Sequence, residues 1–245
     1  MNRFFSPDKN ISAGRIIIND RNHVHHIRDV LRLKAGDKAI VFDESGNEYD
    51  CVIEKAQDTV SLQIKSRRSP SPKENTVKLT IACAIPKKSN MSDIIDKLTQ
   101  LGADRIIPLK TKRVIVKLDK HKEVSLHERW KRIVFSASQQ SQRNTLAAVD
   151  PVTDIKKVIS GSADFDLKLI PTLLGRRKSL KETIINAKHK NILVLIGPEG
   201  DFSDEEVELA KKNGFIPISL GDLVLRVETA AVAVASFIRL YFSVY

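Results

Sequence analysis

The sequence predicts two domains of different architecture: a small β-barrel over residues 1–72, and an α/β domain with a mostly parallel sheet over residues 73–245. Before residue 66, short segments alternate between apolar and polar residues, which is typical of closely spaced strands. After residue 75, buried-strand segments alternate with helical patterns, which is typical of a parallel sheet covered by helices. Residues 66–75 are polar and contain two prolines, which predicts a linker.

The elements of the first domain follow from period-two alternation bounded by turn residues such as Ser45 and Gly46. Strands are expected at residues 15–18, 39–42, 49–53 and 60–64, and one short helix at residues 22–31. Small barrels of this kind often bind nucleic acid, although a purely structural role fits the same pattern.

In the second domain, helices are predicted where apolar residues recur at three- and four-residue spacing. Ile94, Leu98 and Leu101 lie on one such face, and Gly102 follows as a C-cap. The last helix, from about Thr229, is apolar on all sides, which predicts burial against the sheet or a second subunit. Strands are expected at residues 79–85, 105–109, 166–170, 192–196 and 215–220, and further helices at residues 126–137 and 205–212.

Composition excludes several classes of protein. The 245 residues are 42% hydrophobic, which is enough for a core and argues against global disorder. The first residues contain no apolar signal-peptide core, and no apolar stretch reaches the roughly 18–20 residues of a membrane span. The only cysteines, Cys51 and Cys83, lie in separate strand-like segments without a CxxC pattern or a nearby histidine cluster. We therefore expect a cytoplasmic protein with neither a disulfide nor a metal site.

The formal net charge of +11 fits a polyanionic partner, most often nucleic acid. The excess is uneven, because residues 1–72 hold 12 basic and 10 acidic side chains and residues 73–245 hold 29 and 20. Ten basic side chains lie between Arg105 and Arg132, against three acidic ones. This cluster favours contact with a polyanion, although a solvated helix face would have the same composition.

Two loops that follow predicted strands are candidate ligand sites, because ligands of α/β sheets bind beyond the carboxyl ends of the strands. In the first, residues 195–203, Glu199 and Asp201 lie in the loop and Ser203 with Glu206 predicts a capping box. Acidic residues here disfavour phosphate and suit a neutral or cationic ligand. In the second, residues 219–229, Arg226 and Glu228 stand among apolar neighbours, as an internal ion pair or as functional groups.

These two loops resemble those of the ribosomal RNA small subunit methyltransferase E family, whose members are SPOUT-class enzymes. The resemblance extends over essentially the whole chain and includes Arg3-Phe4-Phe5, residues 25–32, Gly36-Asp37, residues 97–102 and residues 140–143. The chain departs from the family pattern at three positions. The family usually has Gly where Asp201 stands, commonly Thr where Val227 stands, and Glu where Gln100 stands.

The resemblance implies a PUA-like N-terminal barrel and a C-terminal domain tied in a deep trefoil knot, a rare exception to unknotted chains. It also implies a homodimer in which the partner completes each site, and S-adenosylmethionine as the methyl donor. The implied cofactor-binding residues come from three loops and are Pro171, Thr172, Leu173, Ile196, Gly197, Glu199, Gly200, Leu220, Gly221, Leu225, Arg226 and Thr229.

The implied reaction is methylation of N3 of a uridine in 16S ribosomal RNA, position 1498 in bacterial numbering. Uridine N3–H is weakly acidic, so a carboxylate can take its proton and a guanidinium can stabilise the charge that develops on the base. We assign Arg143 or Arg226 as the stabilising cation and Glu228 as the base or orienting group. Arg28, Arg32, Arg113 and Lys117 are the expected contacts to RNA phosphates.

Other functions remain open at this stage. A ribosome-assembly factor could keep this fold and bind RNA without turnover. A methyltransferase of the same class could act on transfer RNA or on another ribosomal nucleotide. The N-terminal resemblance favours 16S ribosomal RNA within the small ribosomal subunit, and the acidic loop disfavours nucleotide-phosphate chemistry.

Overall fold

The computed structural model describes residues 2–69, 77–87, 91–113, 120–185 and 190–242. The chain forms two compact units. The first comprises Met1–Pro72 together with Ser138–Leu146, and the second comprises Lys73–Ala137 together with Ala147–Tyr245. The sequence-based division places residues 138–146 in the second domain, whereas in the structure this segment packs with the first unit.

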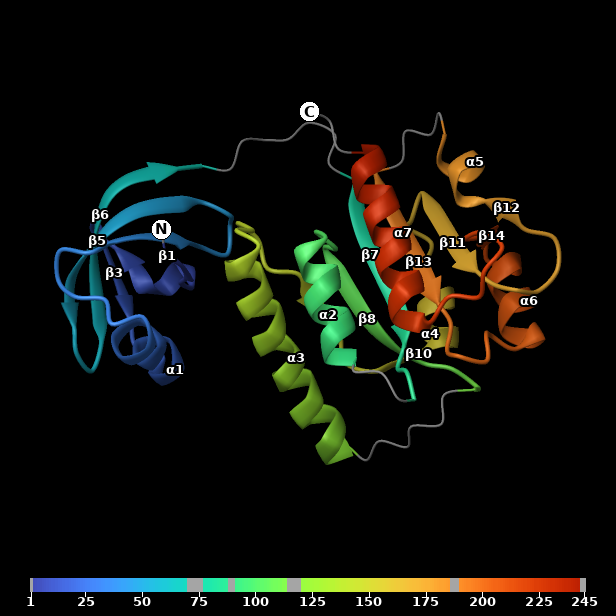
Figure 1. The fold of residues 1–245 in the computed structure, drawn as a ribbon, viewed down its shortest axis with the longest axis horizontal. Helices are drawn as coiled ribbons and strands as arrows, with labels where there is room; N and C mark the ends of the chain where they lie inside the picture. The colour runs from blue at the N-terminus through green and yellow to red at the C-terminus, as the bar shows by residue number, and fades with distance from the viewer. Residues whose placement is uncertain (1, 70–76, 88–90, 114–119, 186–189, 243–245) are drawn as a thin grey trace. The chain divides into compact units, whose positions relative to one another are not determined.

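The first unit is built on one six-stranded curled sheet (Figure 1). In hydrogen-bonded order its strands are β1 (Asn2–Phe5), β4 (Lys38–Phe42), β5 (Glu48–Ala56), β6 (Val60–Arg68), β3 (Arg15–Ile18) and β2 (Ile11–Ser12), with a short 3₁₀ turn η1 (Asp8–Asn10). β1 pairs in parallel with β4, and the other pairs are antiparallel. The four predicted strands are confirmed, whereas β1 and β2 were missed because neither shows period-two alternation.

The predicted helix of the first unit is confirmed as α1 (Arg21–His25) followed by a π-helical turn, η2 (His26–Val30). The Asp20 carboxylate caps α1 by accepting hydrogen bonds from the backbone N–H of Asn22 and His23, at 3.1 and 3.0 Å. Val24 and Ile27 bury their side chains against the sheet. The helical segment therefore closes the core of this unit.

Arg3 holds the segment that follows α3 against the first unit. Its guanidinium donates hydrogen bonds to Glu48 of β5 at 2.5 Å and to Asn144 at 2.7 Å. Its backbone carbonyl accepts a hydrogen bond from the Gln139 side chain at 3.0 Å. Arg143, one of the two proposed cations, therefore belongs to the first unit.

The second unit contains an eight-stranded sheet in which every pair is parallel, as predicted (Figure 1). The order is β10 (Thr153–Asp154), β8 (Arg105–Lys110), β7 (Lys78–Ala84), β13 (Asn191–Ile196), β11 (Leu167–Pro171), β14 (Ile216–Ser219) and β12 (Lys178–Ser179), with β9 (Ala148–Val149) also paired to β8. The longer strands were predicted, whereas β9, β10 and β12 have two residues each and carry no readable period.

Helices cover both faces of this sheet, because alternate strand residues are apolar on each side. Ile192 and Val194 of β13 point to one face, and Leu193 and Leu195 to the other. The first face packs against α2 (Met91–Gln100), α3 (Lys120–Gln140), α5 (Leu180–Ile184) and α7 (Val227–Phe242). The second packs against α4 (Ile155–Ser160) and α6 (Asp204–Lys212). The helices α4 and α5 were not predicted, and both are short.

The last helix, α7, is buried against the sheet on one side only, and the predicted alternative of burial against a second subunit stays a prediction for its other side. Ala231, Val234, Ala235 and Ile238 are buried against the sheet. The opposite side exposes Phe237, Leu240 and Tyr241, which are 37%, 71% and 43% accessible. An all-round apolar helix therefore leaves one apolar face exposed in a single chain.

The remaining expectations concern disulfides, metal sites and membrane-spanning segments. Both cysteines are free and buried, Cys51 in the core of the first unit and Cys83 in that of the second. Within the described ranges, no cluster of three or more His, Cys, Asp or Glu side chains is placed to hold a metal ion. None of the helices in those ranges has the length and apolarity to cross a membrane.

A buried carboxylate organises the β4–β5 hairpin. Asp43 is 3% exposed, and its oxygens accept hydrogen bonds from the backbone N–H of Ser45 and Asn47, the Asn47 amide and the Tyr49 hydroxyl, at 2.7–2.9 Å. Burial by itself raises the pKa of Asp43, but the hydrogen bonds from Asn47 and Tyr49 outweigh it and the pKa is lowered.

We predict that Asp43→Asn destabilises the chain by about 1–3 kcal/mol at pH 7, because an amide nitrogen then faces buried donors. A lowered folded-state pKa stabilises the fold above the unfolded value of about 3.9, and this stabilisation is lost as the pH falls through the folded value. Urea unfolding of the full chain at pH 7 and at pH 3 measures both effects. The exposed Asp58→Asn is the matched control, and equal acid sensitivity in Asp43→Asn and wild type would contradict the assignment.

Candidate active site

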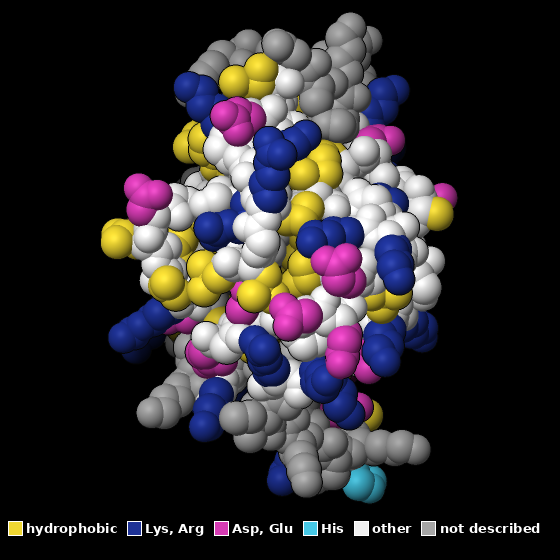
Figure 2. Space-filling view, turned by 90° about the vertical axis from the view of Figure 1, so that its right-hand side faces the viewer, with side chains coloured by type: hydrophobic (Ala, Val, Ile, Leu, Met, Phe, Trp, Pro, Cys, Tyr) yellow, Lys and Arg dark blue, Asp and Glu magenta, His cyan; other side chains and the backbone are white. Residues whose placement is uncertain are grey.

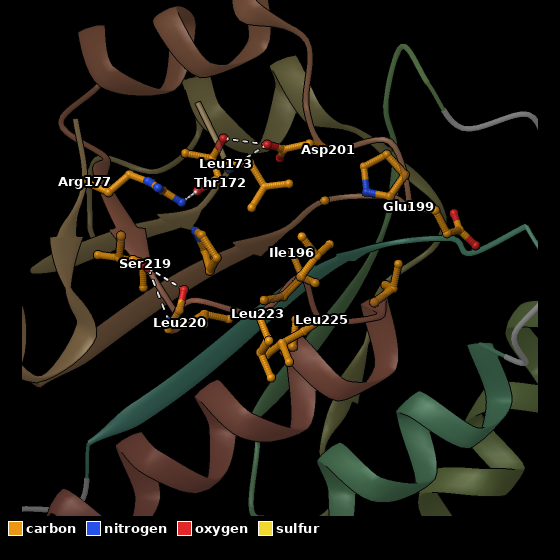
Figure 3. Close-up of a pocket in the computed structure, with 18 residues that line it drawn as sticks. Thr172, Leu173, Arg177, Ile196, Glu199, Asp201, Ser219, Leu220, Leu223 and Leu225 are labelled. Carbon is orange, nitrogen blue, oxygen red and sulfur yellow. Dashed lines mark hydrogen bonds between the residues drawn. The ribbon is translucent and has the colours of Figure 1, made fainter. Parts of the chain in front are cut away.

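One pocket lies at the carboxyl ends of three adjacent parallel strands, β11, β13 and β14, where the loops that follow them meet (Figure 3). Ligand sites of α/β sheets occur at this edge. The lining residues are Pro171, Thr172, Leu173, Arg177, Ile196, Gly197, Pro198, Glu199, Asp201, Ile218, Ser219, Leu220, Gly221, Leu223, Val224, Leu225, Val227 and Ala230.

The loop after β13 is shaped by close packing beneath it. A Cβ at Gly197 would lie 3.0 Å from the ring of Phe202, which is fully buried, so any larger residue would require this ring to shift. The predicted capping box is present, since Ser203 caps α6 and the Glu206 side chain accepts from the Ser203 backbone N–H. Glu206 is 4% exposed and also accepts from the backbone N–H of Lys112 at 2.7 Å. Glu206 therefore joins the start of α6 to the end of β8.

The loop after β14 forms the apolar wall of the pocket. Gly221 has φ +118°, a conformation that side chains rarely adopt, and the Ser219 hydroxyl donates to its carbonyl at 3.0 Å. Leu223 and Val224 follow, at 80% and 74% exposure, and both reach the pocket rim. In the view of Figure 3, Leu223 lies on the opposite side of the pocket from Asp201.

The pocket contains few charges. Arg177 donates a hydrogen bond to the Thr172 carbonyl at 3.2 Å, and Glu199 accepts one from the backbone N–H of Lys87 at 2.8 Å. Asp201 accepts from the Thr172 hydroxyl. With one cation and two carboxylates among its described lining residues, and an acidic first turn of α6 beside it, the pocket disfavours a phosphate group.

Most of the expected cofactor-binding residues line this pocket. They are Pro171, Thr172, Leu173, Ile196, Gly197, Glu199, Leu220, Gly221 and Leu225. Gly200, Arg226 and Thr229 are exposed and do not line it. The main residues that sequence reasoning missed are Arg177, Asp201, Leu223 and Val224. Of these, Asp201 already stood out as a departure from the family pattern, whereas Arg177 carries no local signal.

The three candidate catalytic residues are not gathered at the pocket. Arg226 is exposed, and no ion pair joins it to Glu228 in the described part of the chain. Glu228, in the first turn of α7, lies near Lys97 of α2. The pKa of Lys97 is raised mainly by a hydrogen bond to Asp93, with a further contribution from the charge of Glu228. Arg143 is in the first unit.

The expected RNA contacts fall in different places. Arg28 and Arg32 line a groove of the first unit together with Leu33, Lys34, Ala35, Glu54, Lys55, Ala56 and Gln57. Arg113 of the second unit donates a hydrogen bond to the carbonyl of Gly200, next to the pocket. Lys117 lies outside the described residues.

Comparison with known proteins identifies the family. The RNA methyltransferase domain model matches residues 73–239, and the RNA methyltransferase PUA domain model matches residues 18–65. A ribosomal RNA small subunit methyltransferase E of Bacillus subtilis is 32% identical over 217 residues, 84% of this chain and 83% of that protein. One from Synechocystis is 35% identical over 216 residues, 84% of this chain and 67% of that protein.

Solved structures agree with the sequence matches. A methyltransferase from Legionella pneumophila, in complex with the cofactor SAM, superposes with a TM-score of 0.88 at 29% identity, over 98% of this chain and 97% of that one. A ribosomal RNA small subunit methyltransferase E from Neisseria gonorrhoeae, bound to S-adenosyl methionine, superposes with a TM-score of 0.86 at 27% identity, over 98% of both chains.

The fold, the pocket and these matches define the chain as an RNA methyltransferase with an N-terminal PUA domain. More narrowly, it belongs to the ribosomal RNA small subunit methyltransferase E family.

Proposed function

We propose that this chain transfers a methyl group from S-adenosylmethionine to N3 of a uridine in 16S ribosomal RNA. The observation that carries the proposal is the pocket at the ends of β11, β13 and β14. It lies in a chain whose relatives are ribosomal RNA methyltransferases, and two similar structures were solved with this cofactor bound.

The pocket residues fit S-adenosylmethionine better than a nucleotide phosphate. Ile196, Leu220 and Leu225 provide apolar surface for an uncharged adenine. Glu199 and Asp201 leave the described lining acidic, which suits a ligand that carries a sulfonium and an ammonium group. When bound, the cofactor supplies an activated methyl group.

The chain's own residues would then handle the proton and the charge. We propose that Glu228, which follows the pocket-lining residue Val227 in the chain, accepts the proton of uridine N3. A guanidinium, from Arg143 or Arg226, would stabilise the charge on the base oxygens. Arg143 belongs to the first unit, and its assignment relies on the expectation, from the family resemblance, that a partner subunit completes each site.

The target base must also be accessible, because its N3 edge is normally paired. We infer that the base is flipped into the site or is already single-stranded. The trefoil knot implied by the resemblance, and the small ribosomal subunit as the natural substrate, stay predictions of this proposal.

We predict that purified protein with S-adenosylmethionine restores N3-methyluridine to 16S ribosomal RNA or small subunits from a strain that lacks the gene. Glu228→Gln and Arg143→Ala should each reduce the rate about 100-fold or more, as expected on losing a general base or a charge stabiliser. Mass mapping of the modified RNA gives the readout. A methyl group at another nucleotide would refute the target, near-normal rates in both variants would refute the residue roles, and cofactor binding without methyl transfer would favour an assembly factor.

The groove of the first unit supports an RNA-binding role. Arg28, Arg32, Lys34 and Lys55 place four cations around it against Glu54. Arg28 is paired with Asp29 at 2.7 Å and also donates to the Gln57 carbonyl, and Arg32 is exposed at φ 54°. We propose that this groove binds RNA phosphates.

The double variant Arg28→Gln/Arg32→Gln should weaken RNA binding and lower the slope of log K against log salt by about 1.4 to 1.8, the value for two lost phosphate contacts. Lys9→Gln/Arg21→Gln makes the same charge change on the same unit outside the groove and is the control. An unchanged slope in the groove variant, measured by fluorescence anisotropy with a 16S fragment, would exclude this surface.

The exposed apolar face of α7 supports a homodimer. Phe237 lies one helical turn before Leu240 and Tyr241 on the outer side of α7, and its ring stacks on that of Tyr241 at 6.4 Å between ring centroids. Exposed hydrophobic side chains also lie between charged ones on the face drawn in Figure 2. We propose that a second copy covers α7.

Leu240→Glu should shift the chain from dimer to monomer in sedimentation velocity, because a carboxylate would be buried at the interface. Leu240 is 71% exposed, so folding of the single chain should be unaffected. Val124→Glu, at a side chain 66% exposed on α3, should leave the dimer intact. A monomeric wild type, or a dimeric Leu240→Glu variant, would contradict this interface.

A further inference from the structure

Asp201 occupies a backbone conformation that most side chains avoid. Its φ is +60°, in the left-handed region, where glycine is favoured and Asp and Asn are the side-chain residues best tolerated. It stands where the resemblance leads one to expect glycine. An unfavourable conformation at a pocket residue is retained when its side chain makes compensating contacts.

The Asp201 carboxylate makes these contacts across the pocket wall. One oxygen, Oδ1, accepts from the backbone N–H of Phe202 at 2.8 Å, within its own loop. The other, Oδ2, accepts from the Thr172 hydroxyl at 2.8 Å and the Leu173 backbone N–H at 2.7 Å. Thr172 and Leu173 belong to the loop after β11, so one carboxylate joins two of the three loops that form the pocket (Figure 3).

Thr172 extends this connection along its own loop. Its side chain is almost buried, at 6% exposure, and its hydroxyl also accepts from the Leu174 backbone N–H at 3.1 Å. Its carbonyl accepts from the guanidinium of Arg177, the one cation among the described lining residues. In Figure 3, Arg177 and Asp201 approach Thr172 from opposite sides. The position of the loop after β11 at the pocket therefore depends on Thr172 and on its hydrogen-bond partner, Asp201.

We propose that Asp201 and Thr172 form a brace that holds the two loops at the separation S-adenosylmethionine requires, which makes Asp201 a positioning residue. The proposal rests on the placement of the cofactor in this pocket, but not on which nucleotide is methylated. A preformed pocket binds more tightly because ligand binding need not order the loops. The brace should therefore act on cofactor affinity and on the KM for the cofactor, and leave kcat at saturating cofactor unchanged.

Direct binding measurements test the brace without RNA. Isothermal titration calorimetry with S-adenosylmethionine should give a Kd about tenfold higher for Asp201→Asn and for Thr172→Val than for wild type. Thr172→Ser keeps the hydroxyl and should bind within about twofold of wild type. The double variant should bind S-adenosylmethionine as tightly as the weaker-binding of the two single variants, because both substitutions disrupt the same Asp201–Thr172 hydrogen bond. Asp154→Asn, at the N-cap carboxylate of α4 away from the pocket lining, is the control.

The variants also separate the brace from simple charge attraction. Asp201→Asn removes the charge and replaces one of the two acceptor oxygens with an amide nitrogen that cannot accept. Thr172→Val removes the hydroxyl donor of the brace and keeps the Asp201 charge and its bond to the Leu173 backbone N–H. If only Asp201→Asn weakens binding, or if the two effects add, the brace is refuted. Unchanged affinity in both variants, or a lower kcat with an unchanged KM, refutes it as well.

Two controls complete the test. Thermal melting without ligand shows whether each variant is folded. If Asp201→Asn does not fold, the comparison of Thr172→Val with Thr172→Ser tests the brace without it. A wild-type chain that binds no S-adenosylmethionine would refute the proposed function itself. Wild-type binding with an unaffected Thr172→Val variant would refute only the brace.

Discussion

The pocket depends on one constraint, the parallel hydrogen bonding of β11 to both of its neighbours. Leu167–Leu169 pair with β13, and Leu169–Pro171 pair with β14, all in the same direction. Parallel pairing brings the carboxyl ends of the three strands to one edge of the sheet. Residues that are about 25 to 50 positions apart in the chain, such as Thr172, Gly197 and Leu220, therefore line one pocket.

Apolar packing and polar contacts stabilise different parts of the pocket. The buried faces of the strands and Phe202 support the loops from below, and a side chain at Gly197 would crowd the Phe202 ring. Carboxylates then connect the loops to one another and to nearby strands, through Glu206 at the start of α6 and Asp201 at the pocket. Each carboxylate accepts several hydrogen bonds, which compensates for its partial burial.

The departures from the family pattern acquire local explanations in the structure. The amide of Gln100 donates to the Asp96 carboxylate at 2.6 Å, where a glutamate would place two negative charges together. Val227 is 3% exposed and packs in the core at the start of α7, so an apolar residue suits its place. Asp201 adopts an unfavourable backbone conformation, and its carboxylate accepts three hydrogen bonds that compensate for it. These explanations need spatial neighbours that are distant in sequence or on another turn of a helix.

Local periodicity, glycines and capping residues were enough to predict the longer strands and helices, the parallel sheet and two of the loops that form the pocket. Which side chains come into contact depends instead on how distant segments pack, and this could not be predicted from local patterns. Arg177 enters the pocket through a fold of its loop, and residues 138–146 join the first unit through Arg3. The face that α7 leaves exposed also follows from packing, since an all-round apolar helix gives no sign of which side meets the sheet.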